Sequence, residues 1–427
     1  MVSVGLQLAL VPILAAHWGL ERYGLWSMLI AVPAVLLLSD FGFATAATVR
    51  MTMQIARDKQ DAARVTLHSA SQVVLIACGA IVLLGVGGAA FLPDAVLRTL
   101  SAIPTPEVRG AILCLTGYSA LILGTALLLA VLRSHQHFAL GSLLSTITLL
   151  LESGLLVAAV VQGHGLAGGA LALLLGRAIG AVVVWAVAAR LESGVMPGLR
   201  AAQARVRRAL LRPAMAALAI PLGLTLIVQG QVIALGFAAG AAAVPAFVAA
   251  RTLSRLGLQV AQALAQPLMP EFAAMAARGN RAGMVRYFVL VLAGSVTISV
   301  ISALVLALAG SWIVGAWSGG HITAPSGLML AIALSALCGG VWNPVSNLML
   351  AINRHGRFAP ALLGLACAGL IVTLATGAVW GATAAAIAMA LVDGAMLIIV
   401  MRFAAAHWGR PRDWRRILQA GLRSPNP

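Results

Sequence analysis

Twelve apolar stretches follow one another along this 427-residue chain, with polar gaps between them. They cover residues 2–18, 25–48, 66–92, 110–132, 139–162, 166–189, 214–237, 243–269, 287–309, 326–351, 358–378 and 381–401. Most reach the ~20 residues that a helix needs to cross a hydrocarbon core. The pattern predicts an all-α polytopic membrane protein with twelve transmembrane helices.

Basic residues fall almost entirely in every second gap and at the chain ends. Of the 28 lysine and arginine residues, 22 lie there, three lie in the other gaps and three lie inside apolar stretches. Loops rich in Lys and Arg stay in the cytoplasm, so we expect both termini to be cytoplasmic. The net charge of +17 then implies contact with anionic inner-leaflet lipids and not with nucleic acid, for which no motif occurs.

Composition excludes a soluble domain, because 61% of the residues are hydrophobic, 9% are charged and the mean hydropathy is +1.01. The four cysteines lie inside apolar stretches and form no CxxC pair. His135 and His137 form an HxH pair in a short loop, which favours a solvated pair over a metal site. No hydrolase, metalloprotease or nucleotide-binding motif occurs, so we expect no cofactor, no metal and no enzymatic activity.

The longest polar gap divides the chain into two halves of six stretches. We expect an N-terminal lobe over 1–190, a basic cytoplasmic linker over 191–213, a C-terminal lobe over 214–403 and a basic cytoplasmic tail over 404–427. Each half begins and ends in the cytoplasm, so a repeat would be parallel. The first stretch shows no cleavable signal peptide.

Prolines interrupt the first two stretches of each half: Pro12 and Pro33, then Pro221 and Pro245. Paired interruptions can mark a binding site or a bending element, and ordinary membrane-helix proline is the alternative. In the linker, Arg205, Arg208 and Arg212 repeat at helical spacing. This pattern fits either a basic helix on the inner leaflet or a solvated loop.

Six ionisable residues lie inside the stretches, where each is costly and therefore a functional candidate. They are Asp40, Glu152, Arg177, Arg251, Arg255 and Asp393. Glu152 and Arg177 stand at similar depth in consecutive antiparallel helices, so an ion pair is expected. That pair either serves function or neutralises charge within the bundle. Gly176 and Gly180 flank Arg177 in a GxxxG pattern that favours close helix packing.

The eighth stretch carries the clearest polar pattern. Arg251, Arg255, Gln259, Gln262 and Gln266 fall within a stripe about 80° wide on an otherwise apolar helix. Such a stripe cannot face lipid tails, so it lines a water-filled cavity or a polar helix contact, and we favour the cavity. Asn343 and Asn347 form a shorter polar face in the tenth stretch.

Several segments resemble the polysaccharide (O-antigen type) flippases of the multidrug/oligosaccharidyl-lipid/polysaccharide exporter superfamily. They are residues 17–26 (HWGLERYGLW), 38–44 (LSDFGFA), 249–251 (AAR), 266–271 (QPLMPE) and 279–280 (GN). The resemblance implies two six-helix lobes around a central, often cationic cavity. It also implies alternating-access export of lipid-diphosphate-linked sugars across the bacterial inner membrane, with polysaccharide assembly proteins as further partners.

Two departures from that family matter. The chain begins almost at its first stretch, which is the pattern expected if the natural start lies upstream. Gln229, Gly230 and Gln231 stand where many relatives carry an acidic residue or Asn, which leaves the coupling ion open.

The leading interpretation is therefore a lipid-linked oligosaccharide flippase. Its expected substrate-binding residues are Arg251, Arg255, Gln259, Gln262, Gln266, Arg177, Asn343 and Asn347, and its expected ion-coupling residues are Asp40, Glu152 and Asp393. A multidrug exporter of the same superfamily is one alternative, although it would need a carboxylate-lined site. A membrane polysaccharide polymerase or ligase is the other, with His321 as its single outer-loop candidate.

The charge pattern predicts that residue 200 lies in the cytoplasm and residue 320 on the opposite side of the membrane. Reporter fusions at the two positions, one active only inside the cell and one active only outside, are expected to give opposite results. Equal reporter activity at both positions would contradict the topology.

Overall fold

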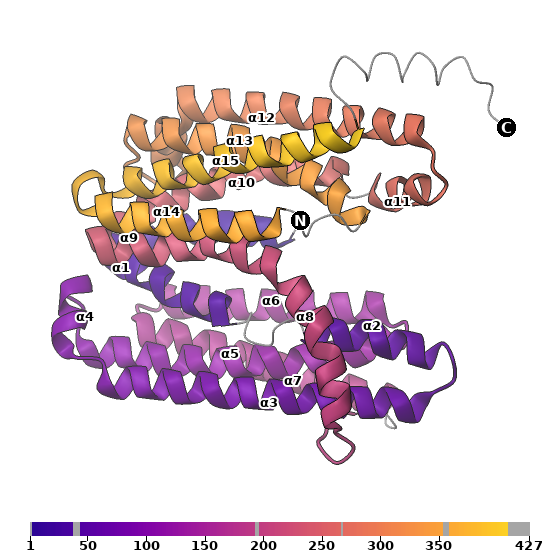
Figure 1. The fold of residues 1–427 in the computed structure, drawn as a ribbon. Helices are drawn as coiled ribbons and strands as arrows, with labels where there is room; N and C mark the ends of the chain where they lie inside the picture. Colours follow the sequence, from indigo (N-terminus) through magenta and orange to yellow (C-terminus); the bar gives the residue numbers. More distant parts are fainter. Residues whose placement is uncertain (1, 37–42, 193–195, 266–267, 353–357, 409–427) are drawn as a thin grey trace. The chain divides into compact units, whose positions relative to one another are not determined.

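The computed structural model describes residues 2–36, 43–192, 196–265, 268–352 and 358–408, and within them it contains helices and no strand. Two compact units divide the chain: Met1–Thr225 with Gly240–Ala242, and Leu226–Ala239 with Ala243–Pro427 (Figure 1). The first unit holds α1 (Val2–Leu36), α2 (Phe43–Ile55), α3 (Gln60–Phe91), α4 (Asp94–Leu100), α5 (Thr105–Ser134), α6 (Phe138–Val161), α7 (Leu166–Leu191) and α8 (Ala204–Thr225).

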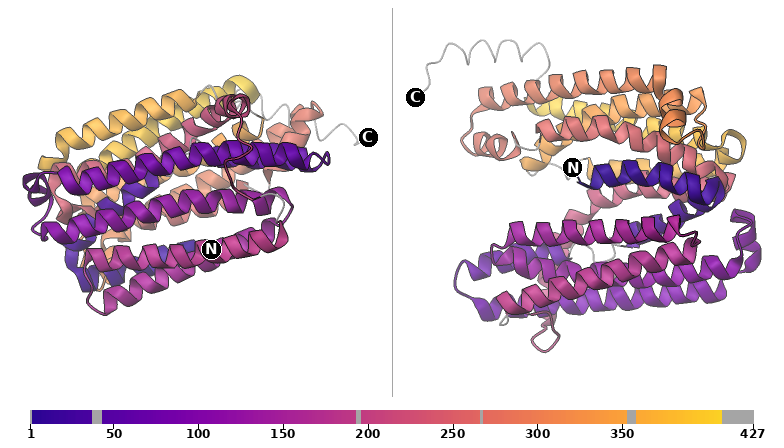
Figure 2. Two further views of the ribbon diagram at one scale, coloured as in Figure 1. Left: turned by 90° about the horizontal axis from the view of Figure 1, so that it is seen from below. Right: turned by 180° about the vertical axis from the view of Figure 1, so that it is seen from behind.

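The second unit holds η2 (Leu226–Gly230), α9 (Gln231–Ala239), α10 (Val244–Ala265), α11 (Met269–Ala277), α12 (Arg281–Trp317), α13 (Ser326–Ala351), α14 (Ala359–Trp380) and α15 (Ala382–Trp408). A 3-10 turn, η3 (Ala241–Ala243), precedes α10. Within this unit α12, α13 and α15 pack side by side, and α14 packs on α15 and α9 (Figures 1 and 2).

The described parts of the twelve apolar stretches are helical almost throughout, which confirms the predicted all-α class. Nine helices among the described residues are long and apolar enough to cross a membrane, and they carry stretches three to seven and nine to twelve. The first stretch and the beginning of the second share α1, and the eighth lies on α10, whose polar stripe lowers its hydropathy.

Helix α1 is two helical segments joined at Gly19, which has φ 70° and ψ 176°. Glycine has no Cβ and adopts this left-handed φ without the steric cost that other residues incur. Next to the kink, the Trp18 indole nitrogen donates to the His164 carbonyl oxygen at 2.8 Å. Trp18 also meets Trp26 edge to face, with 5.2 Å between ring centroids. The kink therefore places two consecutive predicted spans on either side of one fixed turn.

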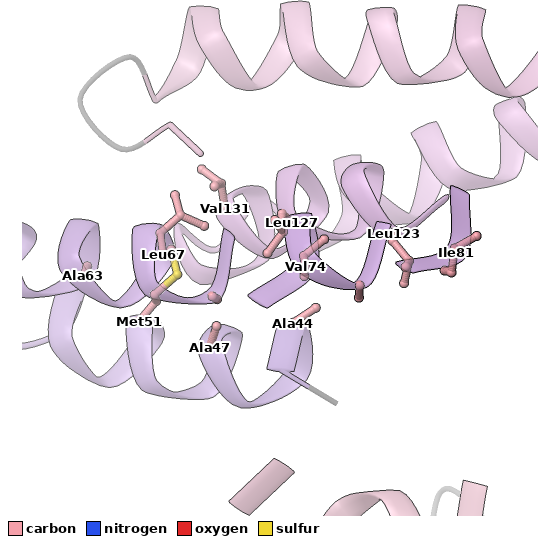
Figure 3. Packing of buried hydrophobic residues seen from close by; sticks show 12 residues of the cluster. Ala44, Ala47, Met51, Ala63, Leu67, Val74, Ile81, Leu123, Leu127 and Val131 are labelled. Atoms are coloured by element: carbon pink, nitrogen blue, oxygen red, sulfur yellow. The ribbon is translucent and has the colours of Figure 1, made fainter. Parts of the chain in front are cut away.

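Small and flexible side chains fill the core between α2, α3 and α5. Ala47, Met51, Ala63, Leu67 and Val131 are fully buried there, and Figure 3 shows them between the helices. Alanine lets the helices come close, and methionine fills the gaps that remain.

Helices α6 and α7 touch through the predicted GxxxG pair. A Cβ added to Gly176 would lie 2.9 Å from the Glu152 Cα, and one added to Gly180 would lie 2.3 Å from the Thr148 Cγ2. No larger residue fits without moving a neighbour, so the two glycines set the distance between these helices.

The basic linker is helical from Ala204 onward, as the first residues of α8. Its apolar residues Val206 and Leu210 are buried against Phe43, while Arg205 and Arg208 are exposed. From Ala204 onward the linker is thus a helix and not a solvated loop. The apolar side of this helix packs on the protein and not on the inner leaflet. The predicted lobe and linker boundaries remain a prediction.

Of the two prolines predicted to interrupt helices in the second half, Pro221 lies inside α8, and Pro245 does not interrupt a helix. Pro12 and Pro33 lie inside α1, but Pro245 is the second residue of α10 and interrupts no helix. A first-turn N–H has no partner within the helix, so proline costs nothing there. Pro344 lies inside α13 instead.

Candidate functional site

A buried ion pair connects α6 and α7 in the first unit, as the sequence predicted. The Arg177 Nε lies 2.6 Å from Glu152 Oε1, and Arg177 Nη2 donates to Glu152 Oε2 at 3.1 Å. Tyr118 of α5 donates its hydroxyl to the same Oε2 at 3.2 Å. The guanidinium also stacks over the Tyr118 ring, with 5.4 Å from Cζ to the centroid.

Glu152 Oε2 accepts hydrogen bonds from both Arg177 and Tyr118. Oε1 and the Arg177 Nε meet as an ion pair without hydrogen-bond geometry, and Glu152 is only 1% exposed. The contact requires Gly176, because any side chain there would collide with the Glu152 backbone. The geometry therefore fits a charge-neutral pair that holds three helices together.

The polar stripe of the second unit begins with a buried arginine. Arg251 Nη1 donates to the Val228 carbonyl oxygen, and its Cζ lies 5.5 Å from the centroid of the Phe247 ring. Val228 belongs to η2, a π-helical turn in which the regular i→i+4 bonding changes. Arg251 is therefore anchored within its own unit.

The following stripe residues are half-buried. Among the residues that the structure describes, no side chain pairs with the Arg255 guanidinium, which burial partly removes from solvent. Gln262 Nε2 donates to Asn343 Oδ1 of α13 at 3.1 Å. At this residue the stripe forms a polar contact between helices, which was the alternative to a water-filled cavity. Gln259 and Asn347 are half-buried as well. Gln266 lies outside the described residues.

A second buried carboxylate lies in α15 and has neutral partners. Ser335 Oγ donates to Asp393 Oδ2 at 2.5 Å, and Trp342 Nε1 donates to Oδ1 at 3.0 Å. Both partners come from α13, and Gly339 faces the carboxyl group between them. The ion pairs found among the described residues do not include Asp393, which is 5% exposed. It thus contrasts with Glu152, whose charge a cation balances.

Gln231 is the last residue of the segment 229–231, which stands where many relatives of the resembling family carry an acidic residue or Asn. It is fully buried directly after η2, and its Oε1 accepts a hydrogen bond from Thr373 of α14. Its Nε2 has no hydrogen-bond partner within the described part of the chain. A neutral pair therefore occupies this position in the core of the second unit.

The HxH pair at the end of α5 meets a carboxylate. His135 Nε2 and His137 Nε2 each lie 3.3 Å from an oxygen of Glu192, at the end of α7. No group of three or more metal-ligating side chains occurs over the described ranges. These contacts join two helix ends at one end of the first unit.

The structure thus brings together Glu152 with Arg177, and Gln262 with Asn343. Sequence reasoning did not identify the hydrogen-bond partners of the buried polar residues, which are Tyr118, Ser335, Trp342 and Thr373. Uncharged polar and aromatic side chains are common in membrane helices, so their presence alone does not indicate such a partner. Asp40 lies outside the described residues.

Comparison with known proteins places the fold. No protein-family profile matches the chain, and no curated protein matches it in sequence. Among solved structures, an inward-facing multidrug resistance MATE family transporter of the MOP superfamily aligns with a TM-score of 0.77 at 13% identity, over 99% of this chain and 96% of its own. The lipid II flippase MurJ, in an inward closed conformation, aligns with a TM-score of 0.75 at 13% identity, over 98% and 89%.

A MOP superfamily transporter from Pyrococcus furiosus, described by the reverse polarity of its binding pocket, aligns with a TM-score of 0.56 at 13% identity, over 94% and 93%. At these identities the likeness shows the fold alone. The chain is a multi-pass membrane protein with the fold of these transporters.

Removing one member of the Glu152–Arg177 pair leaves a buried charge without its partner. We expect Glu152→Gln to destabilise the protein by about 3–5 kcal/mol, and the double variant Glu152→Gln/Arg177→Gln to recover most of that loss. Thermal unfolding of the purified full chain in detergent measures both.

The matched control is Arg22→Gln, which breaks a half-exposed pair with Glu107 at 3.4 Å. A surface pair contributes about 0–1 kcal/mol, so the unfolding midpoint should hardly move. A wild-type midpoint for Glu152→Gln would show that the buried pair does not hold the fold together.

Proposed function

We propose that the chain moves a lipid-diphosphate-linked oligosaccharide from the inner to the outer leaflet of the bacterial inner membrane by alternating access, driven by an ion gradient. The observation that carries the proposal is Arg255. It lies on the polar stripe of α10, half-buried, and within the described residues its charge has no counter-ion. A cation kept in such a place at several kilocalories of cost indicates an anionic ligand.

A diphosphate suits this position chemically. Guanidinium offers a planar fork of N–H donors that matches two phosphate oxygens, and such charge-assisted bonds are stronger where water is scarce. Arg251 lies one helical turn before Arg255, and its contact with Val228 fixes its direction. We propose that both arginines contact the diphosphate, with Arg255 as the principal contact.

The amide side chains extend the same surface toward the sugar. Gln259, Gln262, Asn343 and Asn347 offer donors and acceptors for hydroxyl groups, and the bond between Gln262 and Asn343 shows that α10 and α13 present amides to each other. Gln266 extends the series by its spacing. For Arg177, which the sequence also suggested, the bond to Glu152 favours a structural role.

A multidrug exporter of cationic compounds fits the side chains less well. Such a site needs an available carboxylate, but Glu152 pairs with Arg177, and Asp393 is buried and receives two hydrogen bonds. The fold itself serves both kinds of cargo, because a MATE transporter and a lipid II flippase share it. A polymerase or ligase finds no support beyond the exposed His321.

For ion coupling we propose Asp393. A carboxylate held only by neutral donors in an apolar bundle gains free energy by taking up a proton or a cation. Glu152 is already paired with Arg177, so it gains much less free energy by taking up a proton or a cation. The neutral Gln231–Thr373 pair offers no charge in the segment where many relatives of the resembling family carry an acidic residue or Asn.

Arg255→Ala is expected to lower transport about 10- to 100-fold, since hydrogen bonds to a charged group contribute about 1.5–3 kcal/mol. Arg255→Lys should restore transport only in part, because Lys has no fork of donors. The measurement uses proteoliposomes with a fluorescent polyprenyl-diphosphate sugar and a membrane-impermeant quencher.

Arg281→Ala is the matched control, an exposed arginine of the same unit away from the stripe. An Arg255→Ala protein that is folded and transports at the wild-type rate would refute the substrate role. Inhibition of wild-type transport by cationic drugs and not by diphosphates would favour the exporter.

Asp393→Asn should abolish acceleration of transport by a proton or sodium gradient, while Glu152→Gln that remains folded should keep it. The amide preserves an acceptor for Trp342 and is similar in size, so the fold should survive. Gradient-driven transport in the same proteoliposomes measures the effect. Unchanged acceleration in Asp393→Asn would exclude this residue as the coupling group.

A further inference from the structure

An apolar groove of about 740 Å³ opens between α3, α5 and α7 of the first unit. Its lining includes Ser71, Leu75, Leu121, Val182, Trp185 and Met196. Val74 and Leu127, which Figure 3 labels in the core cluster, also line it. The groove is therefore a depression over a packed core, in which α5 packs on both α3 and α7.

The groove lies toward the ends of these helices that the charge pattern assigns to the cytoplasm. Its α5 residues, 120–128, and its α7 residues, 178–189, run from the middle of those helices toward their C-terminal ends, and its α3 residues, 71–78, lie from the first third to just past the middle of that helix. Met196 and Pro197, just after α7, close its cytoplasmic end. It is thus at the depth of the inner leaflet.

The rim of the groove faces hydrocarbon. Leu75 is 57% exposed, Val182 is 64% exposed and Trp185 is 56% exposed. Large apolar side chains this exposed on membrane-spanning helices contact lipid tails and not water. A groove in such a surface is filled by acyl chains.

One polar group lines the groove without a partner. The Ser71 hydroxyl is buried and has no hydrogen bond to any described residue. Neighbouring hydroxyls behave differently: Ser69 donates to the Val65 carbonyl at 2.7 Å and Thr125 to the Leu121 carbonyl at 2.6 Å. The Ser71 oxygen is closed off from solvent in this conformation. An ester carbonyl of a glycerolipid would therefore accept from it after the side chain rotates toward the groove, and the Trp185 indole N–H offers a second donor at the interface.

Positive charge stands at the cytoplasmic end. Arg190 follows the lining residue Ala189, and Arg200 follows Pro197 by three positions; both side chains are exposed. The nearby carboxylate of Glu192 is already in contact with the His135 and His137 rings. An anionic headgroup would therefore meet net positive charge here.

We propose that this groove is a binding site for an anionic phospholipid of the inner leaflet. One acyl chain lies between α3, α5 and α7, an ester carbonyl accepts from Ser71, and the phosphate group lies between Arg190 and Arg200. An isoprenoid tail would fill the apolar part but has no ester for Ser71, which is why a glycerolipid is preferred. The site is independent of the proposed transport substrate.

The test counts lipids retained by the delipidated full chain in native mass spectrometry, after addition of phosphatidylglycerol or phosphatidylcholine. The blocking variant is Gly124→Phe, because a Cβ at Gly124 on the groove wall meets nothing within 4 Å. The matched control is Gly154→Phe in α6, where a Cβ also meets nothing within 4 Å and which does not line this groove. We expect the first to lower phosphatidylglycerol retention about tenfold and the second to leave it unchanged.

A charge test is independent of the steric one. Arg190→Gln/Arg200→Gln should remove the preference for phosphatidylglycerol over phosphatidylcholine, whereas the equally exposed pair Arg205→Gln/Arg208→Gln should keep it. Equal retention of both lipids by the wild type, or wild-type retention by folded Gly124→Phe, would overturn the proposal. Displacement of phosphatidylglycerol by an equimolar polyprenyl phosphate would overturn the assigned occupant in favour of an isoprenoid tail.

Discussion

Every polar group inside a bilayer must find its partner within the protein, because hydrocarbon supplies none. The backbone meets this requirement by forming helices throughout the described ranges. Many hydroxyl groups meet it within their own helix, as Thr48 does with Ala44, Ser119 with Leu115 and Thr376 with Val372. The few groups that need a partner from another helix define the buried sites of both units.

Three of those buried sites, at Glu152, Asp393 and Gln231, have a glycine beside them. An added Cβ at Gly176 would lie 2.9 Å from the Glu152 Cα, one at Gly339 would lie 3.3 Å from the Asp393 Cγ, and one at Gly369 would lie 3.1 Å from the Gln231 Nε2. In a low-dielectric interior a polar contact must be short to offset desolvation. The glycines allow the helices to approach until side chains of ordinary length can meet. Packing and polar pairing are therefore one requirement in this fold.

Much of this architecture could be predicted from the sequence, because it depends on length and charge. Stretch length predicts the spans, and equal depth in antiparallel helices predicts the Glu152–Arg177 pair. Other features need the folded structure. Nothing in the composition of α13 indicates that Ser335 and Trp342 converge on Asp393, since their seven-residue spacing becomes meaningful only beside α15. The polar stripe could be located, but what it faces depends on neighbours that periodicity does not describe.

The π turn η2 also changes how the seventh span can be compared with other proteins. A π turn accommodates one residue more than an α turn, which rotates everything after it by about 100° relative to an unbroken helix. Side chains before Leu226 and after Gly230 therefore follow different helical registers. A related protein with an uninterrupted α-helix here would need one residue fewer to place a side chain where Gln231 lies. Gap-free sequence alignment across this span would then pair Gln231 with a residue on a different face of the helix.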